Sequence, residues 1–236
     1  LGVGDIVDEQ QGGYTFDKLT VSSAIGWLRN EGQALKAKKQ PWYLAVNIVN
    51  PHDVTYVNSD LPGKPVQGAK HAMTILPVPT TDLYKATWDN YPLPKSRHQA
   101  LDAPGRPKAH KLYQEIWDLL MGEWPNEDHR WRLLLDYYFN CMRDSDENVA
   151  AVMLGLKDSG MEENTIVIFT ADHGELGGSH QMRGKGTTAY KEQNHVPLMI
   201  IHPAYPGGKE CQAITSQIDL ATTILAMTGK DSQSIQ

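Results

Sequence analysis

Charged and imidazole side chains gather in segment 172–195, where they are interspersed with glycines. The segment contains these candidates for chemistry: Asp172, His173, Glu175, His180, Arg183, Lys185 and His195. An adjacent carboxylate and imidazole offer oxygen and nitrogen ligands to a divalent cation. Lys185 lies between Gly184 and Gly186, so its backbone can approach a ligand closely. A metal, a lysine and a histidine together favour a tetrahedral oxyanion such as sulfate or phosphate.

Simpler interpretations of the same residues exist. An isolated Asp-His-Gly is typical of a capped turn, in which the aspartate bonds local amides and the glycine relieves the backbone. The charged residues that follow could form a solvated basic loop. That loop would explain the glycines and charges, but not their position between two apolar runs, 165–170 and 196–201.

These two runs and a third, 42–49, have the composition and length of buried strands. Run 42–49 is followed by Asn50-Pro51 and then by His52 and Asp53. A histidine beside a proline is, taken alone, more often a turn residue than a catalyst. In a sheet built from crossovers, however, ligands bind beyond the carboxyl ends of the strands. We therefore expect His52 and Asp172 at one edge of the sheet.

Helical periodicity predicts helices at 17–30, 111–121, 127–157 and 218–227. Strands separated by helices predict an α/β fold with a mainly parallel sheet and flanking helices. Eleven of the 14 prolines lie between Pro41 and Pro125, and segment 50–110 has little periodicity. Long irregular segments of this kind are usually functional. Asp144, Asp146 and Glu147 are interpreted as part of a solvated helix face.

Composition narrows the function classes. The formal net charge is -6, which argues against nucleic acid or an anionic membrane surface as the main partner. Apolar runs are too short for a membrane span, and residues 1–10 have no basic region typical of a signal peptide. Two cysteines, Cys141 and Cys211, give neither a disulfide framework nor a cysteine-based zinc site.

The order and spacing of these segments resemble the sulfatase family of the alkaline-phosphatase superfamily. Segment 164–177 is similar to that family's metal-binding strand and turn. His180, Gly184-Lys185-Gly186 and the strand 196–201 before Pro203 follow in the family's order. Segment 217–225 resembles a helix of the family, and 41–52 is similar to its strand ending in Pro-His.

The resemblance implies a role for each matching residue. Asp172 and His173 would be ligands of a divalent cation, Ca²⁺ in the family, with Mg²⁺ or Mn²⁺ as alternatives because of the imidazole. Lys185 would contact the sulfate and the nucleophile. His52 would bind the sulfate and protonate the leaving alcohol, and His180 would line the substrate pocket.

The family's nucleophile is a formylglycine made from the first residue of Cys/Ser-x-Pro-x-Arg, and no such motif occurs in this sequence. We therefore interpret residues 1–236 as the central-to-C-terminal part of a sulfatase catalytic domain, with an incomplete sheet and a Pro-rich loop region at 50–110. The parent enzyme would act on a sulfated small molecule or carbohydrate, and this chain alone would be inactive. The family is compatible with a periplasmic or secreted location.

Two alternatives remain at this point. A phosphodiesterase or phosphonate monoester hydrolase of the same superfamily would also use an Asp-His pair. A non-catalytic metal-binding or partner-binding domain could have kept the fold and lost the chemistry.

Overall fold

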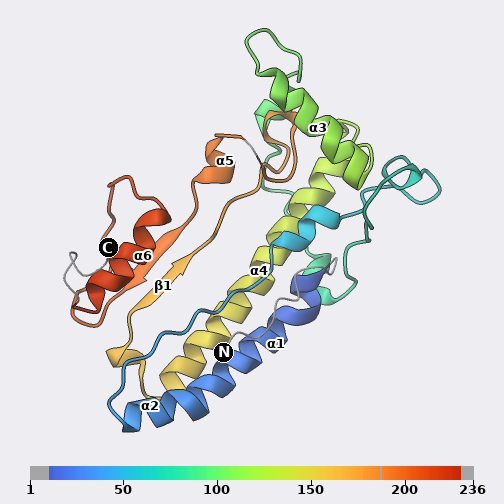
Figure 1. Cartoon of the computed structure of the whole chain (residues 1–236). Helices are drawn as coiled ribbons and strands as arrows, with labels where there is room; N and C mark the ends of the chain where they lie inside the picture. Colours follow the sequence, from blue (N-terminus) through green and yellow to red (C-terminus); the bar gives the residue numbers. More distant parts are fainter. Residues whose placement is uncertain (1–10, 187, 230–236) are drawn as a thin grey trace.

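A computed structural model describes residues 11–186 and 188–229. The chain begins with α1 (Gly12–Trp27), which continues without a break through a π-helical turn (Leu28–Gly32) into α2 (Gln33–Ala37). The predicted helix 17–30 is confirmed within this longer rod. α1 lies alongside α4 (Asp128–Asp158), the longest helix that the described part of the chain contains (Figure 1).

The main core forms on one face of α4. Its apolar residues recur at helical spacing, so they face the same side and pack against the segments around residues 54, 84 and 124. The buried members are Val54, Val57, Tyr84, Trp124, Trp131, Leu134, Leu135, Tyr137 and Cys141. A smaller cluster of Leu28, Leu156 and Met161 joins the far end of α4 to α1 and β1. The core thus holds the helices and the 50–57 turn as one unit.

The irregular region 50–110 consists of short 3-10 turns and loops. These turns are His52–Tyr56, Gln67–Ala69, Asp82–Lys85 and Lys95–His98, and α3 (Lys108–Met121) follows them. Tyr84 of this region is buried in the main core, whereas Tyr91 is 52% exposed. Within the described ranges, no helix is long and apolar enough to cross a membrane.

The predicted first strand, 42–49, does not join a sheet in this structure. It is extended, and residues 42–48 alternate between partly buried and exposed side chains, the pattern of a strand with one face covered. Trp42 and Leu44 pack against the smaller cluster that also includes Val167. A strand is defined by its ladder of backbone hydrogen bonds, and this segment has no partner strand among the described residues.

β1 (Val167–Thr170) and β2 (Leu198–Ile201) confirm the other two predicted strands, but they pair antiparallel, with Val167 opposite Ile201. The prediction of a parallel pair is therefore wrong for these two strands. A parallel pair needs a crossover, usually a helix, whereas the connection here is a long loop with only the four-residue α5 (Lys191–Asn194). The chain consequently returns alongside itself.

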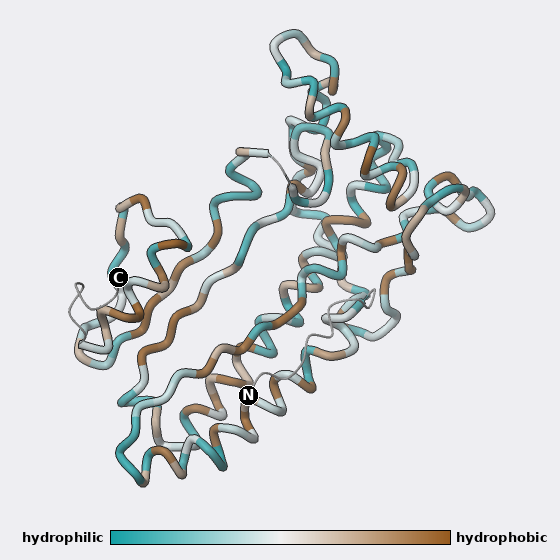
Figure 2. Tube along the Cα trace, viewed as in Figure 1, coloured by the Kyte–Doolittle hydropathy of each residue, from teal (hydrophilic) through white to brown (hydrophobic). Residues whose placement is uncertain are grey.

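The sheet and α6 (Ile218–Met227), whose predicted bounds are confirmed, differ from the core in exposure. All four residues of β2 are exposed, Met199 to 57% and Ile201 to 59%. Figure 2 shows the apolar character of the two strands, of which β1 packs against the smaller cluster through Val167. An uncovered apolar strand is unusual and marks this face as one suited to contact with further polypeptide.

Candidate functional site

His52 begins the 3-10 turn that follows the extended segment. Two aspartates hold this turn against α1. Asp17 accepts hydrogen bonds from the backbone amides of Val49 and Asn50, at 2.7 and 2.9 Å. Asp53 accepts from Gly13 and Tyr14, at 2.9 and 2.8 Å. The imidazole of His52 is therefore carried by a backbone fixed on both sides.

Lys185 lies on the loop after β1, and helix α3 determines its place. Gly184 has φ of 77° and packs on Trp117, where a Cβ atom would lie 2.3 Å from the indole ring. Glu175 accepts hydrogen bonds from the amides of Gly177 and Gly184, at 3.1 and 2.5 Å. The close contact with Trp117 and the hydrogen bond to Glu175 thus hold the loop in place at Gly184, the residue immediately before Lys185.

These two elements bring His52 and Lys185 together across 133 positions of the sequence. Lys185 Nζ lies 2.7 Å from His52 Nδ1 and donates a second hydrogen bond to Thr55 Oγ1 at 3.3 Å. Both side chains are partly buried. The segments that carry His52 and Lys185 therefore meet at this point, and the roles of the two residues stay predictions.

Burial lowers the pKa of His52 to about 4, and the positive charges of Lys185 and His173 act in the same direction, against the opposing charge of Asp172. The imidazole is therefore neutral at pH 7. Burial also lowers the pKa of Lys185, opposed by the charges of Glu175, Asp172 and Asp53. When the ammonium donates to Nδ1, the imidazole carries its hydrogen on Nε2, which leaves an N–H donor for a ligand oxygen.

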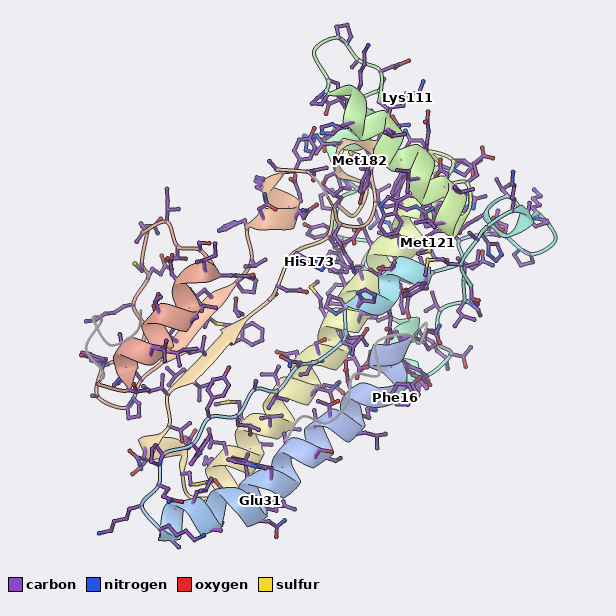
Figure 3. The ribbon with its side chains drawn as sticks, viewed as in Figure 1. Phe16, Glu31, Lys111, Met121, His173 and Met182 are labelled. Carbon is purple, nitrogen blue, oxygen red and sulfur yellow. The ribbon has the colours of Figure 1, made fainter. Side chains whose placement is uncertain are left out.

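Asp172 and His173 follow β1, as predicted, and Figure 3 shows His173 on the segment that continues from this strand. The Asp172 side chain is 83% exposed and that of His173 36%. His173 Nδ1 lies 2.9 Å from the Gly174 carbonyl, which leaves Nε2 free of that contact and 3.4 Å from an Asp172 oxygen. Gln217, just before α6, donates to the Asp172 carbonyl at 2.8 Å. The pair thus presents one carboxylate and one imidazole to solvent.

The donor set fits part of a metal site. A carboxylate oxygen and an imidazole nitrogen suit a divalent cation, and the Nδ1 contact of His173 orients the ring as metal-binding histidines usually require. Ca²⁺ takes six to eight ligands, mostly oxygen. No group of three or more His, Cys, Asp or Glu side chains arranged for a metal ion occurs in the part of the chain that the structure describes. Asp172 and His173 could therefore supply two ligands of a larger set.

His180 does not share the contacts of this site. Its ring stacks on Tyr190 with centroids 3.6 Å apart, and Nδ1 lies 2.9 Å from Gln99 Oε1. Arg106 donates to the His180 carbonyl. All of these contacts join the loop around residue 99 to the loop around residue 190. The role of His180 as a pocket-lining residue stays a prediction.

Sequence reasoning missed the carboxylates behind His52. Asp144 was interpreted as solvated, but it is 3% exposed and accepts a hydrogen bond from Tyr84 Oη at 2.8 Å. Asp17 and Asp53 are 0% and 1% exposed. A signal was available for Asp144 alone: it lies three residues after Cys141 on one face of α4, alongside the apolar stripe, which indicates burial rather than solvation.

The sequence of this chain is similar to that of known proteins. A family model described as Sulfatase matches residues 4–230. Arylsulfatase K from Bos taurus is 25% identical over 212 residues, which cover 87% of this chain and 35% of that protein. The chain thus spans about a third of the length of this relative.

Two solved structures share the fold. The structure of BT4656 in complex with its substrate D-glucosamine-2-N,6-O-disulfate has a TM-score of 0.56 at 16% identity, covering 91% of this chain and 49% of that one. Phosphonate monoester hydrolase from Agrobacterium radiobacter has a TM-score of 0.54 at 20% identity, covering 81% and 34%. These two likenesses confirm the predicted α/β fold, and this chain covers less than half of each of the two structures. The family match over nearly the whole sequence shows that this chain belongs to the sulfatase family.

Proposed function

We propose that the protein containing this chain hydrolyses a sulfate ester, and that residues 1–236 form the central-to-C-terminal part of its catalytic domain. The observation that carries the proposal is the contact between Lys185 Nζ and His52 Nδ1 at 2.7 Å. It joins a cation and an N–H donor, the two groups that a sulfate ester needs, at positions that match the family's pattern.

Each residue of the pair has a distinct task. Lys185 carries a positive charge that attracts the sulfate oxygens and stabilises charge that develops on them. His52 donates from Nε2 to the oxygen that leaves with the alcohol. A bound sulfate ester adds negative charge next to the imidazole, which raises the pKa of His52 from its low value. As Nε2 gives its proton to the departing oxygen, Nδ1 takes a proton from the Lys185 ammonium 2.7 Å away, so the ring stays neutral.

Two groups complete the chemistry. Asp172 and His173 would hold a divalent cation, Ca²⁺ first, with Mg²⁺ or Mn²⁺ as alternatives; bound there, it would supply Lewis-acid stabilisation of the sulfate. A formylglycine from a segment outside these residues would supply the nucleophile. Neither cysteine of this chain begins the motif that gives formylglycine: Cys141 precedes Met142-Arg143 within α4, and Cys211 precedes Gln212-Ala213.

A sulfated small molecule or carbohydrate is the proposed substrate. Support comes from BT4656, whose fold this chain shares and whose structure contains a sulfated glucosamine as substrate. His180 is proposed to line the pocket beyond the sulfate, through its stacked pair with Tyr190.

The test compares an aryl sulfate with an aryl phosphate diester and an aryl phosphonate monoester on the intact protein. Sulfate turnover is expected to be fastest, and to fall at least about 100-fold in Lys185→Ala and His52→Ala. Lys18→Ala, an exposed lysine on α1, is the matched control and keeps full activity.

Three results would contradict the proposal. Preferred hydrolysis of the diester or monoester would identify a phosphodiesterase or phosphonate hydrolase instead. No turnover of any substrate by the metal-loaded intact protein would favour a non-catalytic binding domain. Turnover of the aryl sulfate by the 236-residue chain alone would refute the assignment of the nucleophile to a segment outside it.

A further inference from the structure

The turn that carries His52 and the beginning of α1 are joined by a reciprocal pair of carboxylate–amide contacts. Asp17, on α1, binds the amides of Val49 and Asn50 just before the turn. Asp53, on the turn, binds the amides of Gly13 and Tyr14 at the beginning of α1. The first amides of a helix have no partner within the helix, so Asp53 satisfies two of them. Each element therefore fixes the backbone of the other.

A third contact holds the same turn from α4. Ser145 Oγ donates to the Asn50 carbonyl at 2.8 Å. The Asn50 side-chain amide donates to Tyr84 Oη at 3.1 Å and to Asp144 at 3.4 Å. Asn50 is 4% exposed, so these contacts are shielded from water. The backbone before His52 is thus bound on two sides by buried polar groups, which gives it little freedom to turn.

The burial of these carboxylates costs free energy of folding, which indicates a role beyond ordinary packing. Three carboxylates, Asp17, Asp53 and Asp144, lie close enough to influence one another, and burial raises the pKa of Asp17 to about 6. Lys185 is the cation whose charge acts on Asp53. Tyr84, Tyr137 and Cys141, the other titratable groups here, are buried and bring no positive charge. Buried carboxylates of this kind persist only where hydrogen bonds compensate their desolvation.

We propose that Asp17 and Asp53 are positioning residues that hold the imidazole of His52 against Lys185 by clamping its turn to the beginning of α1. Neither aspartate touches the substrate. Their effect is to set the direction of the backbone on either side of His52, and so the direction in which its Nε2 points. The catalytic meaning of this clamp rests on the proposed function, whereas its positioning effect does not.

The test measures the accessibility of His52 in the 236-residue chain. Diethyl pyrocarbonate acylates neutral imidazoles, and mass spectrometry of peptides gives a rate for each histidine at pH 7. In Asp53→Ala and Asp17→Ala the freed turn should expose His52, and its labelling rate should rise at least about threefold. In Asp53→Asn, which keeps one of the two oxygen acceptors, the labelling rate should rise less than in Asp53→Ala.

Asn140→Ala separates positioning from general loss of stability. Asn140 is 0% exposed and donates to the carbonyls of Tyr84 and Ala86, so its loss also removes buried hydrogen bonds from α4. It makes no contact with the 49–53 turn, and the labelling rate of His52 should not change. An equal rise in Asn140→Ala, or no rise in either aspartate variant, would overturn the proposal.

A second measurement needs no variant and covers the case in which the aspartate variants do not fold. In the unaltered chain, hydrogen exchange at the amides of Gly13, Tyr14, Val49 and Asn50 should be much slower than at residues 43–48, whose amides have no partner among the described residues. Equal exchange in the two sets would contradict the clamp. Neither measurement depends on turnover, so an inactive intact protein would refute the proposed function alone.

Discussion

The turn with His52 and the turn with Asp172 and His173 belong to the same candidate site but are held in opposite ways. Before His52, the amide of Asn50 donates to Asp17 of α1; after it, Asp53 accepts from the amide of Tyr14 on α1, and both carboxylates are fully buried. The Asp172 side chain is 83% exposed, and its turn contacts Gln217, just before the exposed helix α6, and Gln193 of the four-residue α5. The half that would handle the sulfate is therefore preorganised, whereas the half that would hold a metal depends on weakly covered elements.

The two halves differ because different elements support them. The His52 turn is enclosed by α1 and α4, which are part of this chain and form its core. The Asp172 turn follows β1, whose neighbour β2 is exposed along its whole length. A metal site built on such an element needs partners that the described residues do not supply. A substitution in one half at a time therefore tests whether the His52 turn is held more firmly than the Asp172 turn.

The largest effect is expected from Gly184→Val, on the preorganised half. A Cβ atom at this position would lie 2.3 Å from the Trp117 ring, and φ of 77° disfavours any side chain. The free energy of unfolding should fall by about 3 kcal/mol in urea denaturation. Gly207→Val is the control, because no atom lies within 4 Å of its Cβ position. A loss in Gly184→Val no greater than in the control would show that the loop before Lys185 is not fixed.

The next effect concerns pH. The pKa of His52 is lowered from 6.5 in the unfolded chain to about 4 in the folded one. As the pH falls from 6.5 to 4, the unfolded chain therefore binds a proton at His52 before the folded chain does. The contribution of His52 to the free energy of unfolding is thus complete above pH 6.5 and is lost as the pH falls to about 4. Asp17 acts in the opposite sense, because its raised pKa of about 6 stabilises the fold below pH 3.8 and that stability is lost as the pH rises through 6. The two trends oppose each other between pH 4 and 6.

His52→Gln should remove one of these trends and leave the other. Between pH 7 and pH 4 the free energy of unfolding should then decrease by about 1 kcal/mol less than in the unaltered chain, the shift being discounted for the partial exposure of the imidazole. His98→Gln, at an exposed position, should leave the pH dependence as it is. Identical profiles for both variants would place His52 in water rather than in the protein.

The sequence predicts elements that depend on neighbouring residues better than contacts between distant residues. Helix positions follow from apolar periodicity within one segment, and α6 agrees with its prediction residue by residue. The proximity of His52 and Lys185 followed from the family's pattern. Asp17 and Asp53 could not be found, because nothing in the residues around Asp17 indicates that its partners lie at 49 and 50. The direction of β2 was missed because apolar runs do not encode which way a strand runs.

The smallest effect on stability is expected at Asp172, and it is the sharpest test of the contrast. Asp172→Ala removes an exposed carboxylate that, among the described residues, accepts a hydrogen bond only from the adjacent amide of His173. The free energy of unfolding should therefore change by less than about 0.5 kcal/mol. In the intact protein, the same substitution should abolish calcium binding measured by calorimetry, because a carboxylate ligand is lost. Asp146→Ala, an exposed carboxylate of α4, should change neither quantity.

Unchanged calcium affinity in Asp172→Ala would remove Asp172 from the metal site. A large loss of stability would instead contradict the contrast itself, because it would mean that this turn is held as firmly as that of His52. Loss of calcium binding with stability preserved is the combination that separates the two halves: a residue that binds without supporting the fold, opposite a histidine whose position the fold determines.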